Sequence, residues 1–344
     1  MSDVNRQWRL AKRATGMVSE DCFELVTEPA PEPGDGELVV RNVYLAFEPA
    51  MRGWIEDVKS YLPPVGIGEV MRASGAGVVV ASKAEGYAVG DRVSGLFGWQ
   101  DYALLRPGGL TTPTRVPDGV ALTDPLSKLG MTSVTAYFGL LDVGKPLAGE
   151  TVVVTGAAGA TGCVAAQIAR IKGCRVVGIA GGAEKCAWLR DEAKLDGVID
   201  YKSEDVLERL GELCPDGIDV AFDNVGGEQL DAILFHIAER GRIALCGAIS
   251  GYNEAERTPQ LRYVIHMIPR RVRMDGFIVR DFLARAGEAM ADLAKWVAAG
   301  EIAYRIDVQQ GMENVPRTFL RLFRGANQGK QLIRIADEPA AKRA

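Results

Sequence analysis

The sequence predicts an α/β protein of two domains, in which a doubly wound parallel sheet is joined to a domain rich in β-strands. The chain has 344 residues, a length at which two domains are the natural expectation. Six short apolar runs alternate with helix-like stretches between residues 151 and 279, as in a parallel sheet with helices on both faces. The first third of the chain instead alternates branched or aromatic residues with polar ones, and Gly, Pro and Asp punctuate it.

The strand-rich domain is expected over residues 1–128. Its segments 36–49, 74–86 and 90–109 are predicted to be short strands joined by tight turns, which favours a barrel-like, mostly antiparallel arrangement. The end of the chain, residues 303–344, is expected to return to this domain, because it contains a helix, a turn and a strand after the last helix of the second domain.

The second domain is expected over residues 129–302 and holds the parallel sheet. Its strands are continuous apolar runs rather than strictly alternating ones, because helices bury both faces of such a sheet. The six strands are predicted at residues 151–156, 174–181, 196–201, 218–227, 241–250 and 273–279.

Composition and charge argue against several classes of protein. The formal net charge is −5, and no long run of one sign suggests a nucleic-acid partner. The locally basic segment 262–274 is expected to be a solvated face or a subunit contact. No segment reaches the ~18 apolar residues of a membrane helix, and the polar N-terminus lacks a signal-peptide core, so we expect no membrane partner and a cytoplasmic location. The scattered cysteines and only two histidines predict reduced thiols and no metal site.

A glycine-rich turn follows the first strand of the predicted sheet. Gly156, Gly159 and Gly162 allow a tight turn and a close approach of the backbone, and the helix that follows directs free N–H groups and its positive dipole end toward an anion. This is the context in which glycines bind the pyrophosphate of a dinucleotide, although a glycine-rich turn without a ligand is the alternative. The predicted cofactor contacts here are Gly159, Ala160, Thr161 and Gly162.

The end of the second strand predicts which dinucleotide binds. An acidic residue there would bind a free ribose 2′-hydroxyl and repel a 2′-phosphate. Gly181 and Gly182 stand there instead, and Lys185 follows, which favours NADPH/NADP+ even though Glu184 lies beside that lysine. Lys185 is alternatively a solvated surface residue. Tyr201, at the end of the third strand, either reaches the same adenosine end or packs in the core.

The carboxyl ends of the fourth, fifth and sixth strands are rich in glycine and small polar residues. Ligands of doubly wound sheets bind at this edge. Core packing alone would not require an asparagine or a serine at a strand end, so we assign these ends to the cofactor. The residues are Asn224, Cys246, Gly247, Ala248, Ile249, Ser250, Phe277, Ile278 and Val279.

Tyr252 lies just past the fifth strand and carries a phenol near the expected nicotinamide end. A phenol at neutral pH can donate a hydrogen bond or a proton, so Tyr252 is the predicted catalytic residue, in addition to being a cofactor contact. A half-buried loop tyrosine with no catalytic role is the alternative.

Several short motifs resemble those of a known family. "GMTSVTAYFGLL" at 130–141, "AAGATG" at 157–162, "FDNVGG" at 222–227 and "CGAISGYN" at 246–253 are similar to the zinc-free medium-chain dehydrogenase/reductases, and especially to their prostaglandin reductase and 2-alkenal reductase branch. This resemblance implies a Rossmann domain that binds NADPH, a GroES-like catalytic domain and a homodimer. It also implies that Asn327, in "ANQGK", touches the cofactor.

Two departures bear on this resemblance. The branch often carries an aromatic residue where this chain has Ala50, in "EPAMRG", which predicts a wider substrate pocket. The zinc-dependent relatives carry His-Glu in a glycine-rich stretch that here is "RASGAGVVV", with neither residue. The second departure agrees with the prediction of no metal.

These observations together predict an NADPH-dependent oxidoreductase that reduces the carbon–carbon double bond of α,β-unsaturated ketones or aldehydes. Hydride would be transferred to the β-carbon, and Tyr252 would stabilise the negative charge on the carbonyl oxygen. Two alternatives remain at this point: a quinone oxidoreductase on the same fold, and a regulatory protein that binds NADPH without turnover.

Overall fold

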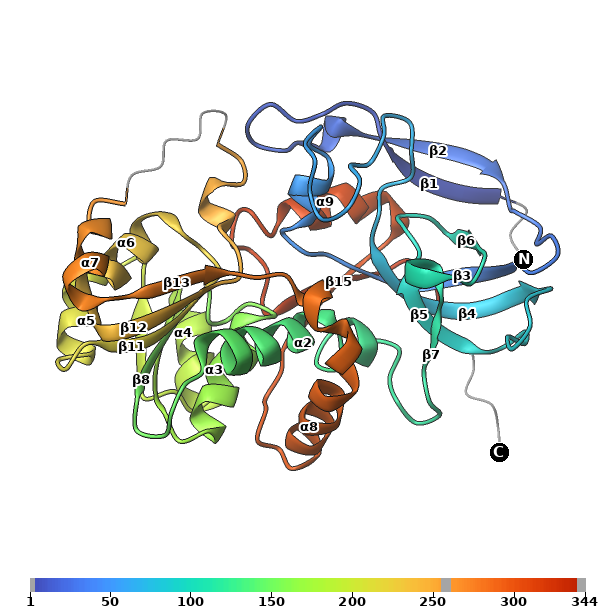
Figure 1. Ribbon diagram of the computed structural model, residues 1–344. Coiled ribbons are helices and arrows are strands. Elements are labelled where there is room, and N and C mark those ends of the chain that lie inside the picture. Colours follow the sequence, from blue (N-terminus) through green and yellow to red (C-terminus); the bar gives the residue numbers. More distant parts are fainter. Residues whose placement is uncertain (1–3, 255–260, 339–344) are drawn as a thin grey trace. The chain divides into compact units, whose positions relative to one another are not determined.

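The computed structural model describes residues 4–254 and 261–338, and the chain divides into two compact units (Figure 1). The terminal unit comprises Met1–Leu126 and Ile306–Ala344, and the central unit comprises Ser127–Arg305. Among the helices formed by the described residues, none is both long and apolar enough to cross a membrane.

The central unit contains a six-stranded sheet in which all strands run parallel, in the order β10-β9-β8-β11-β12-β13 (Figure 1). Successive strands are added on one side up to β10 and on the other side from β11 onward, so the switch point lies between β8 and β11. This confirms the predicted doubly wound fold. The strands are β8 (Thr151–Thr155), β9 (Arg175–Ala180), β10 (Gly197–Asp200), β11 (Ile218–Asp223), β12 (Ile237–Leu245) and β13 (Arg273–Gly276).

The two faces of this sheet bury separate apolar layers. Side chains alternate along each strand, so Val152 and Val154 enter one core while Val153 between them enters the other. The first layer packs with α2 (Met131–Phe138), α3 (Gly162–Ile171), α4 (Ala183–Asp191) and α8 (Ala286–Ala298). The second packs with α5 (Val206–Leu213), α6 (Gly227–His236) and α7 (Met267–Arg270). Burial on both faces is the reason for the continuous apolar runs in the sequence.

The terminal unit is built mainly from antiparallel strands. Its larger sheet follows the order β14-β15-β3-β4-β5-β7, with β6 paired to β3, and β1 and β2 form a separate antiparallel pair. The elements are β1 (Val4–Leu10), β2 (Phe23–Pro29), β3 (Leu38–Ala46), β4 (Ser74–Ser82), β5 (Arg92–Leu96), β6 (Tyr102–Leu105), β7 (Thr114–Arg115), β14 (Ile306–Gln310) and β15 (Lys330–Arg334), with helices α1 (Met51–Trp54) and α9 (Val315–Leu320).

Strand β3 holds the terminal unit together. It pairs with β15, β4 and β6 along different parts of its length, and its register against β4 shifts at Val39/Val40 and at Asn42/Tyr44. Such irregularities bend a strand and increase its twist. Strand β3 has three neighbours because β6 pairs with its first half and β15 with its last residues, while β4 pairs along nearly its whole length. An aromatic cluster of Trp99, Phe47 and Phe319 fills the core beside it.

Candidate functional site

The turn between β8 and α3 is shaped by contacts that only glycine tolerates. A Cβ added at Gly162 would meet the carbonyl oxygen of Gly156 far inside van der Waals distance, and Gly156 itself has a φ of 57°. The N-cap residue of α3, Thr161, makes no side-chain hydrogen bond to the backbone at the start of the helix. The first turn of the helix therefore presents backbone N–H groups toward the turn that contains Gly159 and Ala160, as a pyrophosphate requires.

The turn between β9 and α4 begins with two glycines, the first of which lies against Tyr201. A Cβ at Gly181 would lie 2.6–2.8 Å from the ring and hydroxyl of Tyr201, so the tyrosine ring occupies the space that a side chain would need. Tyr201 remains 44% exposed and covers the turn from outside. The next residue, Gly182, has a φ of 100° and donates its N–H to Asp200 Oδ1 at 2.7 Å.

Charged groups gather at the start of α4. Lys185 is half-buried in the first turn of the helix, directly after the exposed Glu184. The carboxylate of Glu184 forms an ion pair with Arg305, with 3.0 Å between its Oε1 and Arg305 Nη2. Burial opposes ionisation of the nearby Asp200, but bonds from the backbone N–H groups of Gly182 and Lys202 outweigh it and lower the pKa of that carboxyl.

The ends of β8 and β11 are braced by a buried carboxylate. Thr155 Oγ1 donates to Asp223 Oδ1 at 2.6 Å, and the N–H groups of Val225 and Gly226 donate to the same carboxylate. Burial is the largest influence on Asp223 and raises the pKa of its carboxyl above the usual value, although these bonds oppose the change. Asn224 donates its Nδ2 to the carbonyl of Thr155 at 2.7 Å. That bond directs the remaining amide oxygen of Asn224 outward as an acceptor.

The loop after β12 is fastened to the end of β11. The backbone N–H groups of Cys246 and Gly247 donate to the carbonyl of Asp223, at 2.8 and 3.1 Å. Ser250 Oγ donates to the carbonyl of Val225 at 2.6 Å, so its hydroxyl can only accept from a ligand. Burial raises the pKa of the Cys246 thiol to about 12, which keeps it protonated and unreactive at neutral pH.

Tyr252 folds back over this loop. Its hydroxyl oxygen accepts the N–H of Ala248 at 3.2 Å, and a Cβ at Gly247 would lie 3.2 Å from the same oxygen. The bond from Ala248 uses a lone pair of the hydroxyl and not its proton. The residue is half-buried.

The structure thus places most predicted cofactor contacts at two groups of loops on one sheet edge. We call the loops of residues 156–162 and 181–185, with Tyr201, the phosphate end. We call the loops of residues 223–226 and 246–252 the tyrosine end. Both lie at the carboxyl ends of parallel strands that flank the switch point, where doubly wound sheets bind ligands.

The predicted contacts after β13 lie differently. Phe277 is half-buried and packs against the core, with its ring centroid 6.2 Å from that of Phe222 and its ring over Gly139, where a Cβ would clash with it. Ile278 and Val279 are half-buried at the start of a 3-10 helix.

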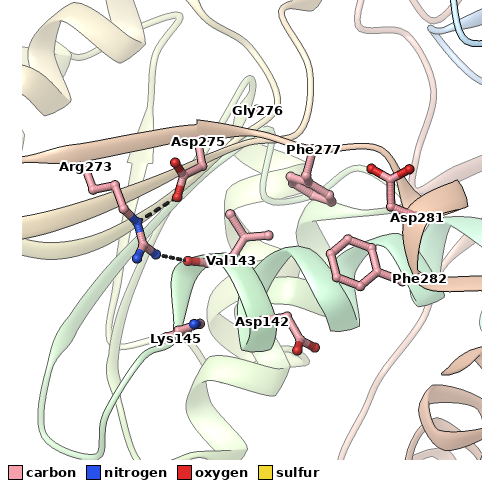
Figure 2. Close-up of a pocket in the computed structure, with 9 residues that line it drawn as sticks. All are labelled: Asp142, Val143, Lys145, Arg273, Asp275, Gly276, Phe277, Asp281 and Phe282. Atoms are coloured by element: carbon pink, nitrogen blue, oxygen red, sulfur yellow. Dashed lines mark hydrogen bonds and ion pairs between the residues drawn. The ribbon is translucent and has the colours of Figure 1, made fainter.

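Phe277 also borders a pocket of about 340 Å³ beside β13. Figure 2 shows its side chain among the residues that line this pocket. Arg273 spans this pocket, because its guanidinium bonds to Asp275 Oδ2 and to the carbonyl of Val143, both at 2.6 Å. No predicted contact other than Phe277 lines it. The lining residues are Asp142, Val143, Lys145, Arg273, Asp275, Gly276, Phe277, Asp281 and Phe282.

Two residues singled out in the sequence belong to the terminal unit. Asn327 lies in the loop before β15 and donates its Nδ2 to the carbonyl of Gly329 at 2.8 Å. Ala50 is half-buried directly before α1. The cofactor contact of Asn327 and the wider substrate pocket at Ala50 both stay predictions.

Comparisons with known proteins agree with the geometry. Residues 6–112 match the family described as the N-terminal domain of oxidoreductase, and residues 160–298 match the family described as zinc-binding dehydrogenase. The chain is 40% identical to the NADPH-dependent curcumin reductase of Escherichia coli, over 97% of this chain and 98% of the relative. It is 37% identical to prostaglandin reductase 1 of Mus musculus, over 96% and 98%. The chain belongs to the medium-chain dehydrogenase/reductases, in the prostaglandin and 2-alkenal reductase branch.

Similarity to a solved structure supports the assignment of this chain to the medium-chain dehydrogenase/reductases. The crystal structure of CurA from Vibrio vulnificus in complex with NADPH superimposes with a TM-score of 0.91 at 40% identity, and covers 96% of this chain and 99% of that one. The resemblance inferred from the motifs is therefore confirmed over nearly the whole length of the chain.

The residues of this medium-chain reductase do not fit the metal implied by the description of its second family. Among residues 4–254 and 261–338, no three His, Cys, Asp or Glu side chains gather where they could hold a metal ion. All six cysteines are free thiols, and five of them are buried.

Sequence reasoning missed three residues of the reductase that shape the site. Asp223 and Thr155 form the brace between β8 and β11, and Arg305 meets Glu184. The aspartate stands inside the motif "FDNVGG", so its place at a strand end was the available signal. No pattern in the sequence connects Arg305 with the start of α4, because the two are distant along the chain.

Proposed function

We propose that this medium-chain reductase is an NADPH-dependent enzyme that reduces the carbon–carbon double bond of α,β-unsaturated ketones and aldehydes. The observation that carries the proposal is the 40% identity with an NADPH-dependent curcumin reductase along almost the entire chain. The geometry of the two ends of the site supports it, because each end supplies what one half of such a reaction requires.

The phosphate end provides the groups that hold NADPH. The backbone N–H groups of Ala160 to Gly162 bind the pyrophosphate, while that of Gly159 closes the turn onto the carbonyl of Gly156, and the start of α3 adds its dipole. Lys185 binds the 2′-phosphate, and the strand end beside it has Gly181 and Gly182 in place of the acidic residue that would bind a free 2′-hydroxyl. The site therefore prefers the phosphorylated cofactor by the attraction of Lys185 and by the lack of an acidic residue at the strand end.

The tyrosine end provides the groups that act on the substrate. When bound, NADPH supplies the hydride that the β-carbon of the substrate accepts. Negative charge then grows on the carbonyl oxygen, and the Tyr252 hydroxyl donates a hydrogen bond to it. The brace of Thr155 and Asp223 holds the loop that carries this tyrosine, so the donor is positioned before the charge develops.

The same sheet carries an edge suited to a second copy of the chain. Strand β13 ends the sheet and has β12 as its one neighbour among the described residues. Apolar side chains stand exposed just before it, with Ile265 at 60% and Ile268 at 73%. An open strand edge beside exposed apolar surface favours a two-fold dimer with the sheets joined through β13. Light scattering should give about twice 37.0 kDa; a 37.0 kDa particle at micromolar concentration would contradict the homodimer.

The compartment we propose is the cytoplasm. Free, mostly buried thiols persist where the environment is reducing, and all six cysteines here are free. Fractionation of the source cells with an antibody to the chain tests this, and recovery in a secreted or membrane fraction would contradict it.

An acceptor screen tests the reaction itself. Purified protein with NADPH is offered enals, enones, aryl enones and quinones, and the loss of NADPH absorbance is followed. With NADPH deuterated on the transferred position, mass spectrometry should find one deuterium on the β-carbon of a saturated carbonyl product. Turnover of quinones alone would make the chain a quinone oxidoreductase. Tight NADPH binding without turnover of any acceptor would make it a regulatory protein.

A further inference from the structure

Residues 303–305, the last of the central unit, lie along the phosphate end of the site. The side chain of Gln167 on α3 exchanges two bonds of 2.8 Å with the backbone of Ala303. The hydroxyl of Tyr304 lies 3.5 Å from the carbonyl oxygen of Ala160 in the glycine turn. Arg305 then reaches Glu184 at the start of α4, with 3.0 Å between Nη2 and Oε1. This segment is therefore held beside the phosphate-binding elements by its own contacts.

Glu184 poses an electrostatic problem at this place. It is the residue before Lys185, and a carboxylate there repels the 2′-phosphate that the lysine attracts. Unit charges interact over about 8–10 Å at ordinary ionic strength, so a carboxylate one residue from a phosphate ligand acts within range. Without a compensating positive charge, Glu184 would therefore weaken the binding of NADPH and leave the binding of NADH unaffected.

Charged groups of both signs surround this turn. The thiol of Cys186 in α4 lies within the influence of the carboxylates of Asp200 and Glu204 and of the cations of Lys185 and Arg190. Glu204 forms an ion pair with Arg209 at 2.8 Å, and Glu184 forms one with Arg305. The partner of the carboxylate next to Lys185 therefore comes from the end of the central unit.

We propose that Arg305 is a specificity-determining residue for the phosphorylated cofactor. Its guanidinium pairs with Glu184, cancels the repulsion between that carboxylate and the 2′-phosphate, and keeps the carboxylate from competing for Lys185. It acts through Glu184 and is therefore a positioning residue rather than a catalytic one. The inference rests on the proposed use of NADPH and deepens it by adding a residue from a distant part of the chain.

A binding experiment without substrate tests this role. The Kd values of NADPH and NADH are measured by quenching of tryptophan fluorescence for the wild type, Arg305→Gln, Glu184→Gln and the double variant. Arg305→Gln should weaken NADPH about 3- to 10-fold at low ionic strength and change NADH less than about 2-fold. Adding Glu184→Gln should restore NADPH binding to about the level of Glu184→Gln alone. The matched control is Arg317→Gln, which removes the same charge and an exposed ion pair with Glu20 in the terminal unit, and should leave both constants unchanged.

Three outcomes would overturn the inference. Equal weakening of both cofactors would mean that Arg305 supports the fold rather than the phosphate site. A double variant as weak as Arg305→Gln would mean that the arginine does not act through Glu184. Unchanged binding in Arg305→Gln would remove its role altogether. Because no acceptor is present, a failure to reduce enones would overturn the proposed reaction and leave this result standing.

Discussion

The two ends of the candidate site solve different physical problems with different means. The phosphate end is built from glycines, exposed charges and a tyrosine ring, and its polar groups meet solvent. The tyrosine end is built around Asp223, a buried carboxylate that accepts from Thr155 and from the backbone of two following residues. The first end is therefore electrostatic and sensitive to salt, while the second is rigid and held by short hydrogen bonds.

This difference teaches how one sheet edge can separate binding from catalysis. Charge at an exposed turn selects a cofactor without fixing any atom to high accuracy, because such forces act over several ångströms. A hydroxyl that must meet a developing negative charge needs a fixed position, and buried bonds provide it. Substitutions at the two ends should accordingly change different measured quantities.

The largest effect is expected from Tyr252→Phe at the tyrosine end. Loss of the hydroxyl should lower the turnover number by about 10²- to 10⁴-fold, as for lost acid–base assistance, while the ring that remains preserves the fold. Turnover and the Kd of NADPH are measured together, because a smaller loss of turnover with weaker NADPH binding would mean that the phenol only supports the cofactor. Tyr201→Phe makes the same chemical change at the phosphate end and should leave turnover nearly intact. Wild-type turnover of Tyr252→Phe on every enone would show that the proton donor lies elsewhere.

The next effect is expected at the phosphate end from Lys185→Ala. A charge-assisted bond is worth roughly 1.5–3 kcal/mol, so NADPH should bind about 10- to 150-fold more weakly while NADH changes little. Titration of both cofactors checks this. Lys83→Ala removes an exposed lysine of the terminal unit and is the control, with no change expected. Parallel losses for NADPH and NADH would remove Lys185 from the 2′-phosphate site.

Gly162→Ala should alter stability rather than selectivity. The added Cβ meets the backbone of Gly156 and Ala157, which cannot yield as a flexible side chain would, so the free energy of unfolding should fall by about 1–3 kcal/mol. Urea unfolding followed by fluorescence gives this value. Gly287→Ala, in the first turn of α8, meets nothing within 4 Å and should be neutral or slightly stabilising. Equal stability of the two variants would contradict the close approach in the glycine turn.

The smallest effect is expected from Thr155→Val beneath the tyrosine end. The valine keeps the shape and removes the hydroxyl that donates to Asp223 and accepts from the N–H of Asn224. Because the backbone of Val225 and Gly226 still donates to the carboxylate, the unfolding free energy should fall by only about 1 kcal/mol. Thr155→Ser retains the hydroxyl and should stay close to the wild type. A loss in Thr155→Ser as large as in Thr155→Val would show that packing, and not the hydroxyl, matters.

Local patterns in the sequence determined the architecture of the central unit and the chemistry of its glycine turn. Continuous apolar runs such as residues 151–155 specify strands buried on both faces, and the spacing of Gly156, Gly159 and Gly162 specifies a turn into a helix. These features depend on neighbours within a few residues, so they can be deduced before any fold is known. The absence of an acidic residue at the end of the second strand, where Gly181 and Gly182 stand, was equally visible, and the family motifs at 222–227 and 246–253 predicted which strand ends would matter.

Only the tertiary structure decided which distant side chains share a space. Tyr201 lies over Gly181, where its ring and hydroxyl approach the position that a Cβ would take. Phe277 packs its ring against that of Phe222, and Arg305 pairs with Glu184 from the end of the central unit. Such pairings arise where strands that are remote in the chain end at the same edge of the sheet. The interaction energy of each pair depends on the distance between the two side chains in space. The separation of the two residues along the sequence does not give that distance.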